Sequence, residues 1–287
     1  MHAIGDARFM VVRMPELPEV EHARRSLEKL AGARIARAVT HDAMVLGSQP
    51  KRAFSRELTD RSIQSVERRG KNLLVHLSGG AGLALHLGMT GSLVLAGPGA
   101  KKSRFARVTL DLGKRGALHF DDPRKLGRLY AGDLADARKA AKYDRLGPDA
   151  ATIGSAKALA ARFEGARVPI KTGLLDQERI AGLGNIHAGE ALFLARIHPM
   201  RSAGSLTTRE WQRLYAGIHE TLDRAIAELD HLDVTGEPLV YVSAGGANRF
   251  LVYDRKGEPC PRCHTPIVRE VNGGRSTYVC PHCQPRD

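Results

Sequence analysis

Four cysteines near the C-terminus constrain the fold of this 287-residue chain more than any other feature. They form two Cys-x-x-Cys pairs, Cys260 with Cys263 and Cys280 with Cys283, with sixteen residues between the pairs. Two thiolate pairs at this spacing match a tetrahedral structural zinc site, which uses all four ligands and leaves no open position for chemistry. Two disulfides are the alternative, and an intracellular location disfavours them. We therefore predict one Zn2+ that holds a C-terminal hairpin together.

The charge of the chain indicates the kind of partner it binds. Lys and Arg number 44 against 31 Asp and Glu, which gives a net charge of +13. Such an excess favours a polyanion, above all nucleic acid, although a ribosome or an acidic lipid surface would also fit. No apolar run approaches the ~20 residues of a membrane span, and residues 1–13 lack the long apolar core of a secretory signal. We expect a soluble, cytoplasmic protein.

Hydrophobic periodicity divides the chain into two halves. Residues 17–30 carry apolar side chains at helical spacing. From about residue 34 to residue 130, short β-like runs alternate with Gly-rich or charged turns, which favours a sandwich or a barrel. The rest is helix-rich until residues 231–249, which are Gly-rich and which we expect to be irregular.

One long helix is predicted in the second half. Thr207 and Glu210 have the spacing of a capping box, and Leu206 and Trp211 that of a hydrophobic staple. Downstream apolar residues recur on one helical face, and these are Leu214, Ile218, Leu222 and Ile226.

The segment MPELPEVE, residues 14–21, places Pro15 and Glu16 at the head of the first predicted helix. A proline at a free chain terminus is a secondary amine, and α-amino groups titrate near pH ~7.7–8.0, so part of it is nucleophilic at neutral pH. Such an amine attacks aldehyde-like carbons and forms an iminium, and Glu16 could transfer protons. The alternative is an ordinary helix start, where Pro and Glu are both common. The catalytic interpretation requires that Met14 is the true start, or that residues 1–13 are cut off, with Met14 then removed.

The segment from Lys171 to Glu190 is predicted as helix, turn, Gly-rich turn and helix. Gly182 and Gly184 directly precede Asn185, so we expect exposed backbone N–H groups at the start of the second helix. This geometry suits a DNA phosphate. Gly-x-Gly also occurs in ordinary turns, and the pattern alone leaves both interpretations open.

Three further segments concentrate charged or apolar residues at turns. Arg68, Arg69 and Lys71 precede a predicted strand, where a lysine held by a glycine turn could assist proton transfer or bind a phosphate. Residues 86–91 (HLGMTG) and 121–127 (DDPRKLG) could insert an apolar wedge into a base stack while an arginine fills the gap. Each segment taken singly also fits an ordinary charged turn, loop or core.

Taken in order, these motifs resemble those of the bacterial formamidopyrimidine-DNA glycosylases, from Met14 to about Cys283. The matching motifs are MPELPEVE, RRGKNL, HLGMTG, DPRKLG, AGLGNIHA followed by ARIHP, YDRKGEPC and the two cysteine pairs. The resemblance implies an α+β fold in which an N-terminal β-sandwich domain with an N-terminal helix precedes an α-helical helix–two-turn–helix domain and a C-terminal zinc-finger hairpin. We place these domains at residues 14–145, 146–249 and 250–287, after an extension of residues 1–13.

The resemblance also implies an activity. Family members remove oxidised purines, such as 8-oxoguanine and formamidopyrimidines, from duplex DNA. They then cleave the strand by β,δ-elimination through a Schiff base on the N-terminal proline. The implied partner is damaged double-stranded DNA, with no membrane, for a monomer in the bacterial cytosol.

Matching positions carry the implied roles. Pro15 matches the nucleophile that attacks the sugar C1′, and Glu16 matches the residue that handles protons. Lys71 matches the lysine of phosphate binding and β-elimination, and Arg275 matches the zinc-finger arginine of phosphate binding and δ-elimination. The other matches are DNA contacts: Met89, Arg124 and Leu126 fill the void left by the flipped nucleotide, and Arg167, Lys171 and Asn185 contact the DNA backbone.

The chain departs from the family pattern at several positions. Leu126 stands where Phe is usual, His187 stands where Tyr is common, and residues 104–108 lack the histidines often found there. Residues 232–249 differ from the common form of the loop that covers an extruded 8-oxoguanine.

Two alternatives remain. An endonuclease VIII-like enzyme for oxidised pyrimidines has the same fold and nucleophile, but Leu17 before Pro18 favours the purine branch, because the pyrimidine branch typically has Gly there. A non-catalytic zinc-finger DNA-binding protein would explain the charge and the cysteines equally well.

Overall fold

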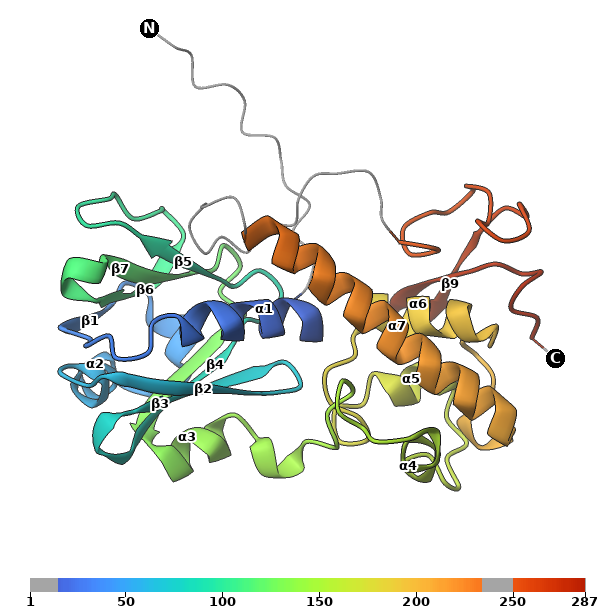
Figure 1. Ribbon diagram of the computed structural model, residues 1–287, viewed down its shortest axis with the longest axis horizontal. Helices are drawn as coiled ribbons and strands as arrows, with labels where there is room; N and C mark the ends of the chain where they lie inside the picture. Colours follow the sequence, from blue (N-terminus) through green and yellow to red (C-terminus); the bar gives the residue numbers. More distant parts are fainter. Residues whose placement is uncertain (1–14, 234–249, 287) are drawn as a thin grey trace, which may run out of the picture.

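The computed structural model describes residues 15–233 and 250–286, which form two lobes placed end to end along the long axis of the molecule (Figure 1). The first lobe contains β-sheets and short helices, and the second contains helices and a β-hairpin. The α+β architecture expected from the sequence is therefore confirmed.

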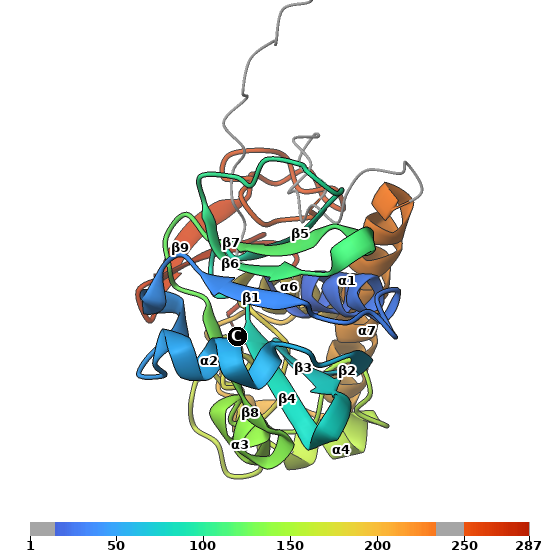
Figure 2. The same ribbon diagram turned by 90° about the vertical axis from the view of Figure 1, so that its left-hand side faces the viewer.

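Two four-stranded antiparallel sheets build the first lobe, and Figure 2 shows them as two layers. The first sheet has the order β1-β6-β7-β5, with bounds Arg37–Thr40, Ala106–Asp111, Ala117–Asp121 and Ser92–Ala96. The second has the order β2-β3-β4-β8, with bounds Ile63–Arg69, Asn72–Leu77, Ala81–His86 and Arg128–Asp133. Strands β1 to β7 fall within the predicted β-like region, residues 34–130, whereas β8 extends beyond it. Two helices, α2 (Lys51–Leu58) and α3 (Leu134–Ala140), flank the second sheet and were not predicted.

The core of the first lobe follows from alternation along the strands. In β6, Ala106, Val108 and Leu110 are buried while the residues between them are less so. Val108 and Leu110 meet inward residues of the other sheet in one apolar cluster. Helix α1 (Leu17–Glu28) contributes Val20 and Leu27 to the same cluster.

Helices α4 (Ala156–Ala161), α5 (Ile170–Leu174), α6 (Asn185–Ala195) and α7 (Thr208–Asp233) form the second lobe. The predicted capping box of α7 is present, since Thr207 N–H donates to Glu210 at 2.8 Å and Glu210 N–H donates to Thr207 Oγ1 at 3.3 Å. The predicted apolar face is also present, with its members buried or half-buried in one core: Leu214, Ile218, Leu222 and Ile226. The backbone of residues 231–233 continues α7, so the irregular structure predicted there is wrong. The remainder of that segment lies outside the described residues.

The third structural unit is a hairpin of β9 (Val268–Asn272) and β10 (Arg275–Val279). It packs on α6 through a small cluster in which Phe193 meets Val252, Ile267 and Tyr278. In addition, the Arg262 guanidinium donates to the Phe193 carbonyl at 2.7 Å, near the C-terminal end of α6.

Helix α1 connects the two lobes. Its first residue, Leu17, lies in the core of the second lobe, and Leu17 N–H donates to the Gly182 carbonyl at 3.1 Å. Further along, α1 lies beside α7, where Arg25 and Asp230 form an ion pair of 2.5 Å (Figure 1). Between the lobes, Arg68 of β2 binds Asp149 at 2.5 Å. These contacts place the N-terminal end of α1 at the junction of the lobes.

Within the described residues, no helix has both the length and the apolar character needed to cross a membrane.

Candidate active site

Glu16 lies at the junction of the lobes and is 1% exposed. Its carboxylate accepts three backbone N–H groups at the start of α6, from Gly184 at 2.9 Å, Ile186 at 2.8 Å and His187 at 3.1 Å. A Cβ atom at Gly184 would lie 2.3 Å from the Glu16 carboxyl carbon, so only glycine allows this approach. The site therefore combines residues from both lobes.

This arrangement corrects one prediction from the sequence. The N–H groups behind the Gly-rich turn were expected to be exposed for a DNA phosphate, and that is wrong for the groups of Gly184, Ile186 and His187. A helix N-terminus binds any nearby anion, and the carboxylate of the chain itself occupies it.

Pro15 is buried directly before Glu16. Glu16 N–H donates to the Glu19 carboxylate at 2.8 Å, which fixes the turn that follows Pro15. The pKa of Glu19 is raised overall, chiefly because the carboxyl is buried. His187 opposes this shift, and the negative charge of Glu16 adds to it. In the full chain the Pro15 nitrogen is the amide nitrogen of the Met14–Pro15 bond.

Lys71 follows the β2–β3 turn and is half-buried. Gly70 in this turn has φ +57°, and its N–H donates to Asp149 at 2.7 Å. A Cβ atom at Gly70 would lie 2.9 Å from the Cβ atom of Ala181, so the turn packs closely on the second lobe. Burial lowers the pKa of Lys71, while the negative charges of Glu16 and Glu19 raise it. Lys71 is therefore close enough to Glu16 and Glu19 for their charges to act on its amine.

The β9–β10 hairpin packs against Lys171 and Asn185 of the second lobe. Lys171 is 1% exposed, and its Nζ donates to Thr277 Oγ1 at 2.9 Å and to the Ser276 carbonyl at 3.3 Å. Asn185 Nδ2 donates to the same carbonyl at 3.0 Å. Burial lowers the pKa of Lys171 to about 8, with opposing contributions from Glu16 and from Arg275. Lys171 and Asn185 were predicted as DNA-backbone contacts, but here both are buried against β10.

Arg275 is exposed at the start of β10. Its positive charge lowers the pKa of Lys71 as well as that of Lys171. Four residues predicted to act together, Pro15, Glu16, Lys71 and Arg275, thus lie around one junction. Arg167, in contrast, is exposed between α4 and α5.

The two loops predicted to form a wedge lie against each other. Asp122 is fully buried and accepts a hydrogen bond from the Thr90 hydroxyl and one from Gly127 N–H at 2.7 Å. Gly88 has φ +66°, and a Cβ atom there would lie 2.6 Å from Gly127 N. The predicted wedge residues stand on these two loops: Met89 is half-buried, Arg124 is exposed and Leu126 is 40% exposed.

The structural roles of two buried carboxylates, Asp122 and Glu190, were not predicted from the sequence. Asp122 precedes a proline, which signals only a turn. Glu190 of α6 is fully buried and accepts N–H groups from Leu251 at 2.7 Å, Val252 at 3.0 Å and Tyr253 at 3.0 Å. It anchors the segment that leads to the hairpin, and a single glutamate within a helical pattern gives no signal of this role.

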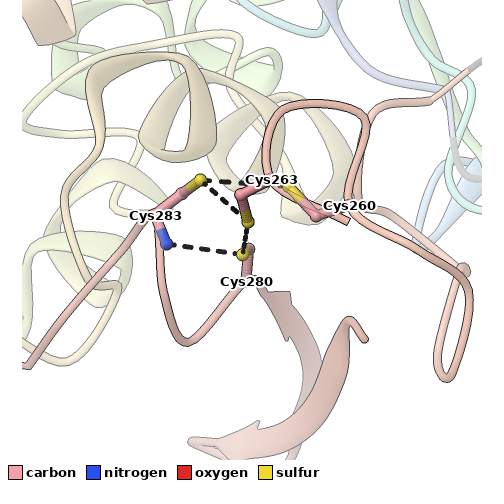
Figure 3. A group of neighbouring side chains, drawn as sticks. All are labelled: Cys260, Cys263, Cys280 and Cys283. Atoms are coloured by element: carbon pink, nitrogen blue, oxygen red, sulfur yellow. Dashed lines mark hydrogen bonds between the residues drawn. The ribbon is translucent and has the colours of Figure 1, made fainter. Parts of the chain in front are cut away.

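The four cysteines converge at the base of the hairpin (Figure 3). Their Sγ atoms all lie within 4.8 Å of one another. Backbone N–H groups of Arg262 and Cys283 donate to Cys260 and Cys280 at 3.4 Å, which stabilises thiolate charge. Four thiols without a carboxylate or imidazole among them fit a closed, structural zinc site, so the predicted cofactor is confirmed.

The sandwich, the helix pair of α5 and α6 and the four-cysteine hairpin together define the class of zinc-finger DNA glycosylases. Family models match the chain as the formamidopyrimidine-DNA glycosylase N-terminal domain at residues 14–129, the H2TH domain of the same glycosylase at 146–234, and the zinc finger found in FPG and IleRS at 257–286. The chain therefore belongs to the formamidopyrimidine-DNA glycosylase family.

Individual relatives agree along nearly their whole length. Formamidopyrimidine-DNA glycosylase of Chloroflexus aurantiacus is 40% identical over 280 residues, which cover 94% of this chain and 98% of the relative. The crystal structure of MutM (FPG) from Thermus thermophilus matches with a TM-score of 0.79 and 36% identity, over 95% of this chain and all (100%) of that one. The complex of Lactococcus lactis Fpg with DNA containing an abasic site matches with a TM-score of 0.83 and 30% identity, over 94% and 100% of the two chains.

Proposed function

We propose that this chain is a base-excision repair enzyme that removes oxidised purines from duplex DNA and then cleaves the strand at the abasic site. One observation carries the proposal: the Glu16 carboxylate, one residue after Pro15, is held at the lobe junction by three backbone N–H groups. A fixed carboxylate beside a secondary amine suits attack on a sugar carbon with coupled proton transfer.

The reaction needs only an amine and groups that move protons. The Pro15 nitrogen lone pair bonds to C1′ as the bond to the damaged base breaks, and the departing base takes a proton. Opening of the sugar ring gives an iminium, which acidifies the C2′ proton, so the 3′ phosphate leaves by β-elimination. A second elimination releases the 5′ phosphate. Binding of the damaged nucleotide beside Pro15 orients the sugar toward the nucleophile and the proton-transfer groups for each step.

Each residue has a role in this proposal. Pro15 is the nucleophile, and Glu16 transfers protons at the sugar and base. Lys71, half-buried beside Glu16, binds a phosphate and assists β-elimination. Arg275 binds phosphate and assists δ-elimination. This chemistry requires a free Pro15 nitrogen, so we propose that the active form lacks residues 1–14.

DNA binding involves both lobes. Met89, Arg124 and Leu126 would fill the gap left by an extruded nucleotide, because flipping a base costs a few kcal/mol that wedge residues offset. Arg167, Lys171 and Asn185 are the proposed backbone contacts. For Lys171 and Asn185, a direct contact requires the side chain to exchange its present partners on β10.

The four cysteines, Cys260, Cys263, Cys280 and Cys283, would hold one Zn2+. That ion would stabilise the hairpin, and β10 would then keep Arg275 near Lys71. We propose a monomer that acts on damaged duplex DNA in the cytoplasm, with domains at residues 14–145, 146–249 and 250–287.

Borohydride trapping on a duplex with 8-oxoguanine opposite C tests the proposal. A protein that starts at Pro15, verified by intact mass, should form a covalent cross-link. The Pro15→Gly variant should lose about 100-fold or more of the trapping while still binding the duplex, because glycine lacks the ring that fixes the nitrogen. A chain that retains residues 1–14 serves as the control and should not trap.

Two results would overturn the assignment. Full trapping by Pro15→Gly, or by a chain with an acylated Pro15, would remove Pro15 from the mechanism. Faster cleavage of a duplex with thymine glycol opposite A than of the 8-oxoguanine duplex would place the enzyme with the oxidised-pyrimidine class.

A further inference from the structure

A concave region lies on the outer face of the β1-β6-β7-β5 sheet, the upper of the two four-stranded sheets in Figure 2. This pocket has a volume of about 430 Å³ and is lined by β1, β6, β7, residues 97–100 and residue 102. We call it the outer-sheet pocket. None of the residues proposed above for catalysis or DNA contact lines it.

A hydrogen-bonded chain of side chains crosses the floor of the outer-sheet pocket. Thr109 Oγ1 of β6 lies 2.9 Å from His41 Nε2 on one side and 2.9 Å from His119 Nδ1 of β7 on the other. The hydroxyl has one proton and two lone pairs, so it bonds to both rings and fixes both orientations. This network orders two imidazole rings at a surface pocket, as a ligand-binding site would require.

His119 is 4% exposed, and its Nε2 has no hydrogen-bond partner among the described residues. An unpaired buried imidazole nitrogen costs free energy, and such groups are rare in folded proteins. His119 is itself one of the residues that line the outer-sheet pocket.

Two cations line the same pocket without a carboxylate partner in the described part of the chain. They are Arg37 of β1 and Lys102 of the covering loop, and both are exposed. The lining contains one carboxylate, that of Asp111, which accepts Gly113 N–H at 2.9 Å. Burial lowers the pKa of His41 and of His119, and the charge of Lys102 lowers both further. The pocket thus has an excess of positive charge that a bound anion would neutralise.

Other charged groups act on the two rings and leave that excess in place. Lys51 at the start of α2 also lowers the pKa of His41, whereas Asp121 of β7 raises that of His119. Asp121 Oδ1 is itself buried without a partner among the described residues.

We propose that the outer-sheet pocket binds a compact phosphate oxyanion. Arg37 offers a planar fork of donors that suits phosphate, Lys102 offers a second cation, and the exposed His41 offers an imidazole on the floor, where Thr109 fixes its orientation. Glycines at positions 97, 99 and 113 leave room for a close approach of the ligand to the backbone, because a Cβ atom at each would meet nothing within 4 Å. No Phe, Tyr or Trp of the described residues lines the pocket, so recognition rests on the phosphate and not on stacking of a base. This inference does not depend on the proposed repair activity.

Calorimetry and histidine side-chain NMR on the full chain test it, at constant ionic strength. The probes are inorganic phosphate, inorganic pyrophosphate and a deoxynucleoside monophosphate. We expect saturable binding of one pyrophosphate per chain, with shifts of the ring resonances of His41 and His119. Equal binding of the monophosphate would support the site and identify a nucleotide as a source of the phosphate, and binding of inorganic phosphates alone would identify a free oxyanion.

Variants separate this site from general surface charge. Arg37→Ala with Lys102→Ala should weaken pyrophosphate binding about 10-fold or more and leave base excision unchanged. Lys101→Ala is the matched control, because Lys101 is exposed in the same loop and does not line the pocket. Thr109→Val removes the central hydroxyl without changing charge and should also weaken binding. Linear, unsaturable shifts would refute the site, and so would a loss of binding in Lys101→Ala equal to that in the double variant of Arg37 and Lys102.

Discussion

The carboxylate of Glu16 accepts the backbone N–H of Ile186 at 2.8 Å, across 170 positions of sequence. Through this bond the N-terminal end of the first helix contacts the first turn of α6 in the other lobe. The residue beside the proposed nucleophile is therefore positioned by backbone groups, which cannot change rotamer as a Lys or Arg partner could. The lobes must both fold before the site exists.

Glu16→Gln tests that relationship. The amide keeps one acceptor oxygen but turns N–H donors toward the N–H groups of α6, so unfolding free energy should fall by about 1–3 kcal/mol. Base excision should fall about 100-fold or more, as for loss of a proton-transfer group. Trapping on a preformed abasic site should fall less, because Pro15 remains.

Single-turnover excision and denaturant unfolding measure the two effects. Glu28→Gln is the matched control, since Glu28 lies on the same helix, is 43% exposed and pairs with Arg24. An unchanged excision rate in Glu16→Gln would show that its carboxylate does not move protons.

The buried amine of Lys171 predicts a pH dependence of stability. Its pKa in the folded chain is about 8, against an ordinary value of 10.5, so the unfolded chain binds more protons between these limits. Stability therefore rises with pH through this window, by up to about 3 kcal/mol from this group. Below pH 8 the full cost of burying the charge is present.

Lys171→Met removes that titration. Between pH 8 and 10.5 the wild-type protein should gain stability relative to this variant in denaturant unfolding. Lys157→Met on α4 changes an exposed lysine instead and should follow the wild-type curve. Parallel curves for wild type and Lys171→Met would mean that the amine is solvated in the folded protein.

Leu126 is the exposed apolar tip of the loop that Asp122 fixes. Leu126→Ala should slow excision about 10-fold at a paired lesion, because the smaller side chain offsets less of the unstacking cost. Excision at a lesion opposite a gap should hardly change, because that base is already unpaired. Leu126→Phe should equal or exceed the wild-type rate.

Single-turnover rates on the two duplexes check this expectation. Met44 in the short helix η1 (Ala43–Leu46) is 60% exposed, and Met44→Ala is a control for loss of surface apolar area. Equal slowing of Leu126→Ala on both duplexes would argue against a wedge.

Removal of zinc should unfold the hairpin and leave the sandwich folded. The hairpin carries Thr277, the Oγ1 partner of Lys171, so its loss should expose that amine and abolish duplex binding. Metal analysis should give one zinc per chain, and amide NMR should show loss of β9 and β10 signals with β3 signals retained. Cys263→Ser should behave like the chelated protein. An active protein without stoichiometric metal would refute the assignment.

The sequence by itself determined the features that depend on local order. Strand β6 alternates because its residues do, Thr207 and Glu210 cap α7 because they are three residues apart, and the paired cysteines mark their own metal site. In these cases the physical cause lies within a few residues of the effect. Helix α2 escaped prediction because only Phe54 and Leu58 of its eight residues are buried, too few to show a period.

The tertiary structure decided which partner each polar group meets. Local pattern correctly started a helix at Asn185, but only the packing of the lobes placed the Glu16 carboxylate on that helix and not an external phosphate. Lys171 was expected to contact the DNA backbone, yet β10, more than a hundred positions away, buries it. Backbone donors and lysine amines bind whichever acceptor comes within about 3 Å, and chain topology alone sets which acceptor that is.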